Sequence, residues 1–263
     1  MGPPLLGVAG FPVAHSRSPV MHAAALAELG LDWEYLKVPV APELFAETVR
    51  ALPRSGFRGV NVTVPHKEAA LELADRRSAM AAAIGAANTL TFGDGGAIAA
   101  DNTDAPGFLA ALDQDARGLR ATVLGAGGSA RAVAWALADA GAERVAVVNR
   151  TPGRAVALAE DLGVEVDTAP AAGDLLVNCT SVGLDPTRDG QALEALGLGA
   201  LEPPAVVVDL VYGDGPTPVE RWAAAGGARF VGGREVLVQQ GALSLALWTG
   251  RPAPVDVMRA ALG

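Results

Sequence analysis

The chain has 263 residues and a formal net charge of -9, with 51% hydrophobic and 19% charged residues. This composition supplies a large core and excludes global disorder, and the acidic balance argues against a general binder of nucleic acid or anionic membranes. Cys179 is the only cysteine, so neither an internal disulfide nor a multi-cysteine metal site is expected. The three histidines have no tight acidic cluster beside them, and we assign no metal site.

The start of the chain is apolar, but it lacks a basic segment and its apolar run is short and broken by proline. This favours a first buried strand over a signal peptide. No uncharged stretch reaches the roughly 18 residues that a membrane-spanning helix needs. We therefore expect a cytoplasmic protein.

Strands and helices alternate in the first part of the chain, which predicts an α/β domain. The predicted elements are strand Leu5–Ala9, helix Pro19–Leu29, strand Trp33–Val38, helix Glu43–Leu52, strand Val60–Val64, helical material over Lys67–Ile84, two short strands that flank the turn Gly93–Gly96, and helix Pro106–Leu112.

A second α/β series begins near Arg120. Its predicted elements are strand Ala121–Leu124, helix Ser129–Ala140, strand Arg144–Val148, helix Pro152–Leu162, strands Leu175–Asn178 and Val206–Leu210, and the tail helices Val236–Trp248 and Val255–Leu262. Strands separated by helices of this length indicate parallel βαβ units. The polar stretch Asp113–Arg120 is a candidate hinge, so the chain is expected to form two α/β domains.

A glycine-rich turn links the first strand and helix of the second series. Residues 125–130 read Gly-Ala-Gly-Gly-Ser-Ala, which is the G-x-G-x-x-A pattern of dinucleotide-binding folds in its required place. Gly125 permits the tight turn, Gly127 lets the backbone approach a pyrophosphate, and Ala130 allows close packing of helix on strand. The alternative is a glycine-rich turn without a ligand, which the strand–turn–helix context disfavours.

The end of the next strand indicates which dinucleotide is bound. An acidic residue is expected there for the ribose 2′-hydroxyl of NAD, but the chain has Asn149, Arg150 and Thr151, followed by Arg154. Two guanidinium groups and a hydroxyl suit a 2′-phosphate, so we favour NADP. The alternative is a solvated helix start, although cations at a helix N-terminus oppose its dipole.

Candidate catalytic residues lie in the first half of the chain. Thr63 lies near the end of the predicted strand Val60–Val64, and Lys67 follows that strand. The only other lysine is Lys37. In a chain rich in arginine, a lysine suggests a group that must gain or lose a proton. Asp104 can hold and tune such an ammonium in a proton-transfer pair. A surface lysine and an N-capping aspartate are the alternatives.

Three further polar residues allow two interpretations each. Asn88 interrupts an apolar run, so it is either a structural tie or a ligand contact. Ser16 and Ser18 follow the first strand, where they can bind hydroxyls or a carboxylate of a substrate, or cap the helix that begins at Pro19.

Together, and in this order, these motifs resemble the shikimate dehydrogenase family over essentially the whole chain. The matching stretches are Gly10–Pro19, Asn61–Lys67, Gly85–Leu90, Asp101–Asp104 with Gly107, Gly125–Arg131, Asn149–Thr151, Asn178–Gly183, Asp209–Tyr212 and Gln239–Gly241.

The resemblance implies a role for each matched residue. Lys67 and Asp104 would be the catalytic pair. The shikimate pocket would be lined by Ser16, Ser18, Asn61, Thr63, Asn88, Tyr212 and Gln240. NADP would be held by Gly125, Ala126, Gly127, Gly128, Ser129, Ala130, Asn149, Arg150, Thr151 and Arg154, with Leu210 and Gly233 near the nicotinamide.

The resemblance also implies an N-terminal substrate domain, residues 1–103 with 238–263, and a Rossmann-like NADP domain, residues 104–237, with the active site in the cleft between them. The expected partners are shikimate and 3-dehydroshikimate, with a homodimer as one possible assembly. Three alternatives stay open: a quinate/shikimate dehydrogenase, another two-domain NADP enzyme of the folate-dehydrogenase type, and a non-catalytic NADP-binding regulator. Arg150 and Arg154 argue against an NAD-preferring quinate enzyme.

Overall fold

The structure, a computed structural model, describes residues 2–263 and divides into two compact units. Of the described residues, the first unit comprises 2–107 and 237–263, and the second comprises 108–236. Both divisions fall inside helices, α5 (Asp104–Leu112) and α10 (Gly233–Thr249), and the first division precedes the stretch 113–120 that the sequence suggested as a hinge. That stretch packs within the second unit, where the Gly118 N–H donates to the Gly141 carbonyl. Asp104 consequently lies in the first unit.

The first unit alternates strands with short helices. Its strands are β1 (Leu5–Gly10), β2 (Glu34–Pro39), β3 (Phe57–Val62), β4 (Arg76–Arg77), β5 (Thr89–Phe92) and β6 (Ile98–Asp101). Its helices are α1 (Ser18–Glu28), η1 (Pro42–Leu44), α2 (Phe45–Ala51), η2 (Leu52–Ser55), α3 (Lys67–Leu73), α4 (Ala79–Ile84), η3 (Asp94–Gly96), the first part of α5, most of α10, and α11 (Val255–Ala260).

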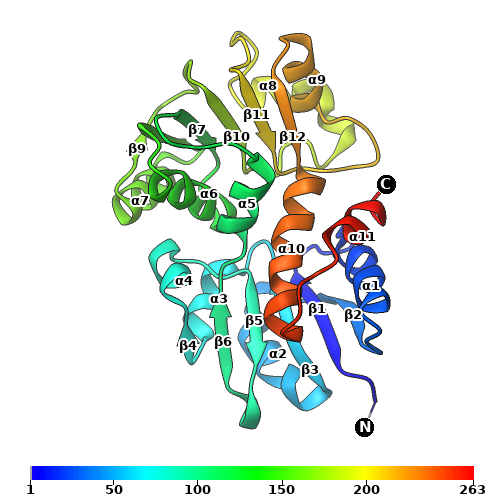
Figure 1. Cartoon of the computed structure of the whole chain (residues 1–263). Helices are drawn as coiled ribbons and strands as arrows, with labels where there is room; N and C mark the ends of the chain where they lie inside the picture. Colours follow the sequence, from blue (N-terminus) through cyan, green and yellow to red (C-terminus); the bar gives the residue numbers. More distant parts are fainter. Residues whose placement is uncertain (1) are drawn as a thin grey trace. The chain divides into compact units, whose positions relative to one another are not determined.

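These strands form one mixed sheet with helices on both faces (Figure 1). Its order is β2-β1-β3-β5-β6-β4, with β5 antiparallel to both β3 and β6. One face packs on α1, α10 and α11 through Met21, Leu245 and Met258, and the other packs on α2, α3 and α4. The predicted hairpin is confirmed: β5 and β6 are joined through Gly95 and Gly96, whose positive φ angles of 70° and 84° favour glycine.

The second unit is an all-parallel sheet. Its strands are β7 (Arg120–Leu124), β8 (Arg144–Val148), β9 (Glu165–Val166), β10 (Leu175–Asn178), β11 (Val206–Asp209) and β12 (Arg229–Gly232). Its helices are α6 (Gly128–Asp139), α7 (Pro152–Leu162), η4 (Pro186–Gln191), α8 (Ala192–Ala195) and α9 (Pro218–Ala225), besides the end of α5 and the start of α10.

The strand order is β12-β11-β10-β7-β8-β9. Read from β9, this is the 3-2-1-4-5-6 order of the Rossmann fold, whose ligand crevice lies at the carboxyl ends of the strands where the order reverses. Here that point is β7 and β10. The α/β fold class with a Rossmann-like second half is therefore confirmed.

One predicted helical stretch is broken by tertiary pairing. Residues 67–84 form α3, the short strand β4 and α4, not continuous helix. The interruption is stabilised because β4 pairs with β6 and the Asp75 carboxylate accepts from the Ile98 N–H at 2.8 Å. Ser78 then caps α4 by accepting from the Ala81 N–H.

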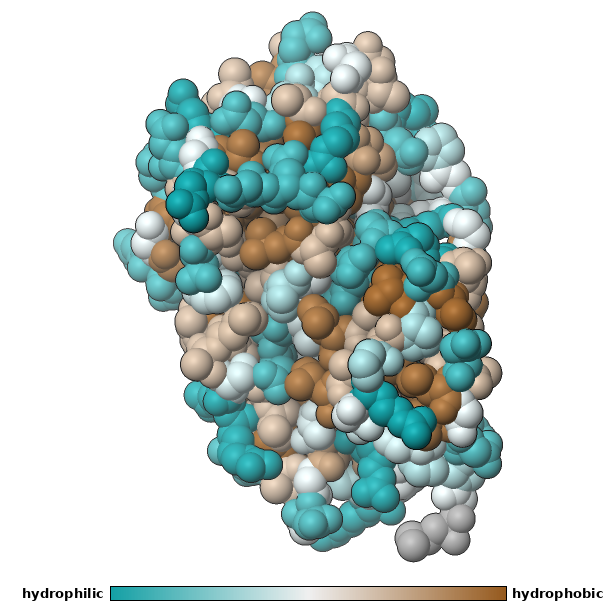
Figure 2. Space-filling model, viewed as in Figure 1, coloured by the Kyte–Doolittle hydropathy of each residue, from teal (hydrophilic) through white to brown (hydrophobic). Residues whose placement is uncertain are grey.

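Among residues 2–263, no helix has the length and apolar character that a membrane span requires. On the face that Figure 2 shows, hydrophobic residues lie in separate patches among hydrophilic ones.

Candidate active site

In the first unit, the predicted substrate residues gather at one edge of the sheet. Register pairs Val8 of β1 with Asn61 of β3, Asn61 with Thr89 of β5, and Thr89 with Asp101 of β6. The carboxyl ends of β1, β3 and β6 and the amino end of β5 therefore share this edge. The segments that follow or precede them carry the serines, Lys67, Asn88 and Asp104.

Lys67 and Asp104 form an ion pair at this edge. Lys67 Nζ lies 2.5 Å from Asp104 Oδ2, and the two side chains are only 10% and 15% exposed. Each is the first residue of its helix, α3 or α5. The N-capping interpretation of Asp104 is wrong, because the Ala105 N–H donates to the side chain of Asn102, 3.1 Å away, which leaves the Asp104 carboxylate for Lys67. The lysine is likewise buried and not a surface residue.

Asn88 connects the ion pair to its surroundings. Its amide nitrogen lies 2.9 Å from Asp104 Oδ1, 2.9 Å from the Thr103 hydroxyl and 3.1 Å from Gln240 Oε1. Its carbonyl oxygen accepts from the Thr103 backbone N–H at 2.7 Å. Asn88 therefore has a structural role, because its hydrogen bonds orient Asp104 and Gln240. That role does not prevent it from also contacting a ligand.

A buried polar network that the sequence did not indicate supports Asn88. Ser244, on α10, has no exposed surface and lies within 3.1 Å of Asn61, Thr89 and Thr103. The Asn61 amide donates to Ser244 at 2.8 Å and accepts from the Tyr35 hydroxyl at 2.8 Å. Asn61 is thus engaged inside the protein. Ser244 interrupts the apolar stretch 241–248 of α10, so no motif marks it, although a buried hydroxyl there needs partners.

Ser16 and Ser18 lie together at the end of β1. Their hydroxyl oxygens are 3.2 Å apart, and both residues are buried. The capping position of α1 is occupied by Arg17, which makes no side-chain cap. Lys37 of β2 donates to the Ala14 carbonyl in the same loop, which gives the second lysine a structural partner. Thr63, just past β3, is half-buried.

A glycine allows α5 and α10 to cross closely beside these groups. A Cβ atom on Gly107 would lie 2.6 Å from the Gln240 nitrogen and 2.7 Å from the Gln240 Cα. Gly107 is thus required for Gln240 to reach Asn88. In the sequence, Gly107 belongs to a matched motif but has no predicted role.

In the second unit, the glycine-rich turn leads from β7 into α6 at the strand ends. Gly125 has a φ of 110°, and a Cβ there would approach the backbone of Cys179 to 3.2 Å. Gly127 precedes the first helical residue, Gly128, so the backbone N–H groups of the first helical turn point outward from the helix start. Ala130 is fully buried against the sheet. This geometry fits a pyrophosphate at the N-terminus of α6.

The two arginines at the end of β8 are exposed. Arg150 and Arg154 make no salt bridge or side-chain hydrogen bond with residues 2–263, and the first turn of α7 contains no acidic residue. The Asn149 amide donates to the Thr151 carbonyl at 3.0 Å, which shapes the turn that carries them. Two unpaired cations at a helix N-terminus fit a bound phosphate.

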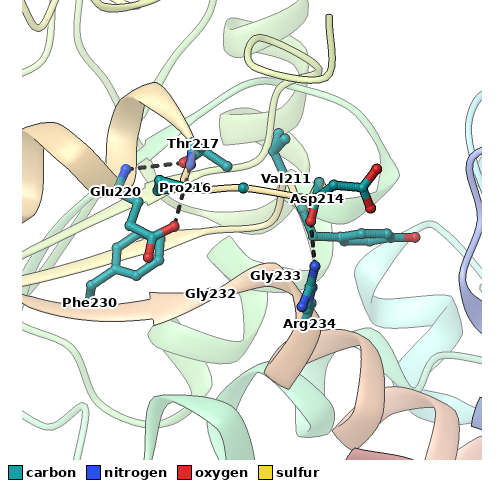
Figure 3. A pocket seen from close by; sticks show the side chains of 12 residues that line it. Val211, Asp214, Pro216, Thr217, Glu220, Phe230, Gly232, Gly233 and Arg234 are labelled. Carbon is teal, nitrogen blue, oxygen red and sulfur yellow. Dashed lines mark hydrogen bonds between the residues drawn. The ribbon is translucent and has the colours of Figure 1, made fainter. Parts of the chain in front are cut away.

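Leu210 and Gly233 also lie side by side, since a Cβ on Gly233 would be 2.5 Å from the Leu210 carbonyl oxygen. Beside them is a cavity of about 330 Å³ lined by the loop after β11, including Tyr212 and Thr217, and by Phe230 and Arg234 (Figure 3). The Arg234 guanidinium donates to the Gly213 carbonyl at 2.6 Å. Tyr212 belongs to this unit, unlike the other predicted substrate residues.

His66 and His22 are buried and pack against aromatic rings. His66 Nε2 lies 2.7 Å from the Val40 carbonyl and its ring stacks on Phe45 at 4.3 Å; burial lowers its pKa. His22 is fully buried and stacks on Tyr35 at 4.1 Å. Within the described residues, no group of three His, Cys, Asp or Glu side chains is placed to hold a metal ion.

Three family models match successive parts of the chain. Residues 8–90 match the shikimate dehydrogenase substrate binding domain, residues 109–180 the shikimate/quinate 5-dehydrogenase model, and residues 233–262 the shikimate 5′-dehydrogenase C-terminal domain.

Several relatives cover nearly the full length. The shikimate dehydrogenase (NADP(+)) of Anaeromyxobacter sp. strain K is 46% identical, over 97% of this chain and 95% of that protein. The Thermus thermophilus shikimate 5-dehydrogenase, solved with NADP(H) and shikimate, is 43% identical with a TM-score of 0.88 over 98% of each chain. A more distant structure, the 5-ketofructose reductase of Gluconobacter sp. strain CHM43, is 30% identical with a TM-score of 0.82 over 99% of this chain and 98% of that one. On this full-length similarity, the chain belongs to the shikimate dehydrogenase family.

Proposed function

We propose that this protein is an NADP-dependent oxidoreductase that interconverts 3-dehydroshikimate and shikimate. The observation that carries the proposal is the buried Lys67–Asp104 pair, held by Asn88 at the sheet edge where Ser16, Ser18 and Gln240 also lie. A buried ammonium held against a carboxylate is suited to proton transfer, which a binding protein does not perform. This arrangement disfavours a non-catalytic regulator.

Different residues of the first unit recognise different groups of the substrate. Ser16 and Ser18 offer hydroxyl donors for a carboxylate, and Thr63, Asn88 and Gln240 offer donors and acceptors for ring hydroxyls. The Asn61 side-chain amide donates to the backbone carbonyl of Asn88 at 3.2 Å and so helps to position Asn88. Tyr212 is the contribution of the second unit.

Lys67 and Asp104 handle the proton. In the reducing direction the Lys67 ammonium donates a proton to the oxygen of the substrate carbonyl as that oxygen gains negative charge, and Asp104 holds the ammonium in position. In the oxidising direction the same pair accepts the hydroxyl proton. Asn88 keeps the carboxylate oriented through its 2.9 Å hydrogen bond, so the pair is pre-arranged before the substrate arrives.

The second unit binds the cofactor. When bound, the nicotinamide of NADP supplies the hydride chemistry. The turn of residues 125–130 holds the pyrophosphate, Asn149 and Thr151 shape the adenosine end, and Arg150 and Arg154 bind the 2′-phosphate. Leu210 and Gly233 contact the nicotinamide. Residues 1–103 with 238–263 thus act as the substrate domain and residues 104–237 as the NADP domain, except that Asp104 itself belongs structurally to the former.

The test is a spectrophotometric assay of NADP⁺ reduction by the purified protein with shikimate, quinate and reduced 5-ketofructose, each repeated with NAD⁺. We expect turnover with shikimate and NADP⁺, with a kcat/KM well above that for the other pairs. Equal or better turnover with quinate and NAD⁺ would support the quinate-enzyme alternative. Absence of turnover with every pair, in a protein that still binds NADP⁺, would support the regulator.

Location and assembly complete the proposal. We propose a cytoplasmic location for this NADP-dependent enzyme. A homodimer is the proposed assembly, and light scattering on the purified protein measures it.

A further inference from the structure

The loop between β11 and α9 carries residues of the proposed site but has little intrinsic stiffness. It runs from Leu210 to Thr217 and presents Tyr212 to the cavity of Figure 3. Gly213 and Gly215 lie within it, and glycines cost the most conformational entropy to order. Something must therefore hold this loop in one conformation for Tyr212 to be placed.

One buried carboxylate contacts both ends of the loop. Asp209, the last residue of β11, has no exposed surface. Its Oδ1 accepts from the Val211 backbone N–H at 3.1 Å, at the start of the loop. Its Oδ2 accepts from the Thr217 hydroxyl at 2.7 Å, at the end. Thr217 in turn caps α9, where its oxygen accepts from the Glu220 N–H (Figure 3).

The neighbouring strand completes the arrangement. Asn178 ends β10 in register with Asp209 and is also fully buried. Its amide donates to Asp209 Oδ1 at 2.9 Å, and its own oxygen accepts from the Thr180 hydroxyl at 2.7 Å. The loops that follow β10 and β11 are thus joined through one amide–carboxylate pair at the carboxyl edge of the sheet.

We infer that Asp209 is a positioning residue for the reaction, which clamps both ends of the 210–217 loop and so fixes Leu210 and Tyr212 relative to the ligands. The inference rests on the proposed function, since those ligands are NADP and shikimate. Asp209 acts through the loop and touches neither ligand itself. Arg234, which binds the Gly213 carbonyl, holds the middle of the same loop.

The clamp depends on the ionised carboxylate. All three groups around Asp209 donate hydrogen bonds. A protonated or amide side chain keeps its contact with Thr217 only if that hydroxyl turns its hydrogen away and accepts instead, which leaves the buried Thr217 O–H without Asp209 as its acceptor. Burial raises the pKa of Asp209 to about 6, against the opposing effect of these hydrogen bonds, and the Glu220 carboxylate of α9 raises it slightly further. Asp209 is therefore charged at pH 7.5 and increasingly protonated below pH 6.

The experiment compares Asp209→Asn with Asp139→Asn. The first variant keeps the shape of the side chain and removes the charge, and the second makes the same chemical change at an exposed residue at the end of α6. At pH 7.5 we expect Asp209→Asn to lower kcat/KM for shikimate by roughly 10- to 100-fold, the size of effect that a misplacement on the order of 1 Å produces. Asp139→Asn should match the wild-type enzyme.

Two readouts separate positioning from general damage to the fold. The preference for NADP⁺ over NAD⁺, which Arg150 and Arg154 set elsewhere in the unit, should stay unchanged in Asp209→Asn. The ratio of wild-type to variant kcat/KM should shrink as the pH falls below about 6, because the wild-type side chain then resembles the variant.

A second pair of variants guards against misfolding of Asp209→Asn. Thr217→Ser keeps the hydroxyl that Asp209 binds and should lose less activity than Thr217→Val, which removes it. An Asp209→Asn enzyme with wild-type kcat/KM, or one whose deficit is the same at pH 5.5 and pH 7.5, would overturn the inference. If the wild-type protein itself fails to turn over shikimate, the proposed function fails instead.

Discussion

The crossing of α5 and α10 at Gly107 provides a sharp test of how the catalytic pair is positioned. In Gly107→Ala, the new methyl group would lie 2.6–2.7 Å from backbone atoms of Gln240. Backbone cannot swing aside as a flexible side chain can. The helices must therefore separate by on the order of 1 Å to reach ordinary contact distance.

The expected cost falls mainly on activity. Overpacking costs about 1–3 kcal/mol, and alanine regains about 1 kcal/mol of helix propensity over glycine, so the net loss of stability is about 0–2 kcal/mol. Asp104, three residues before Gly107 on α5, and Gln240 both contact Asn88. A displacement on the order of 1 Å at these groups lowers kcat/KM by up to about 100-fold.

The assay combines steady-state kinetics with urea unfolding. Gly93→Ala is the matched control, because Gly93 has a φ of -94° and a Cβ there would approach nothing closer than 3.8 Å. We expect Gly107→Ala to lose at least tenfold in kcat/KM while it unfolds cooperatively at slightly lower urea. A variant that retains kcat/KM within twofold of wild type would show that the close crossing does not position the site.

Three further outcomes follow from single contacts. Arg150→Asp should raise the KM for NADP⁺ at least about tenfold and shift preference toward NAD⁺, since a carboxylate repels the 2′-phosphate; an unchanged KM would remove Arg150 from that role. Lys37→Met should raise the KM for shikimate roughly 3- to 10-fold at unchanged kcat, because the ammonium holds the carbonyl of Ala14 in the serine loop; a change in kcat alone would contradict this. Burial lowers the pKa of His22 from 6.5 to about 3. Between these pH values the native state therefore binds fewer protons than the unfolded state. The free energy of unfolding should consequently fall as the pH drops below about 6.5, by at most ~1.4 kcal/mol per pH unit. Urea unfolding at pH 5 and pH 7.5 measures this, and His22→Leu should reduce the difference.

The sequence predicts best those parts of the fold that short stretches of sequence determine. The second series of strands and helices repeats at βαβ spacing, and its glycine-rich turn fixes the start of α6 to within one residue. The strand predicted over residues 60–64 runs from Phe57 to Val62 instead, because the β-branched run continues past the point where β3 leaves the sheet. Helix α9 is absent from the predicted elements although Thr217, Pro218 and Glu220 form a capping-box pattern that marks a helix start.

The candidate site likewise contains residues that the sequence indicates and residues that only the structure reveals. Lys67 and Asp104 are paired by chemistry and by family resemblance, and the structure brings them to 2.5 Å. Ser244 and Asp209 gain their roles only from contacts between segments far apart in the sequence, such as Ser244 with Asn61. Such contacts depend on the register and packing of the finished fold, which no local pattern encodes.

The central claim is that Lys67, held by Asp104, transfers the proton in the interconversion of shikimate and 3-dehydroshikimate. Its most direct test is the kcat and the shikimate KM of Lys67→Ala, measured by NADP⁺ reduction on a variant shown to be folded by its cooperative urea transition. We predict a kcat lower by on the order of 10²–10⁴ with a KM changed only modestly. A kcat close to that of the wild-type enzyme would contradict the claim.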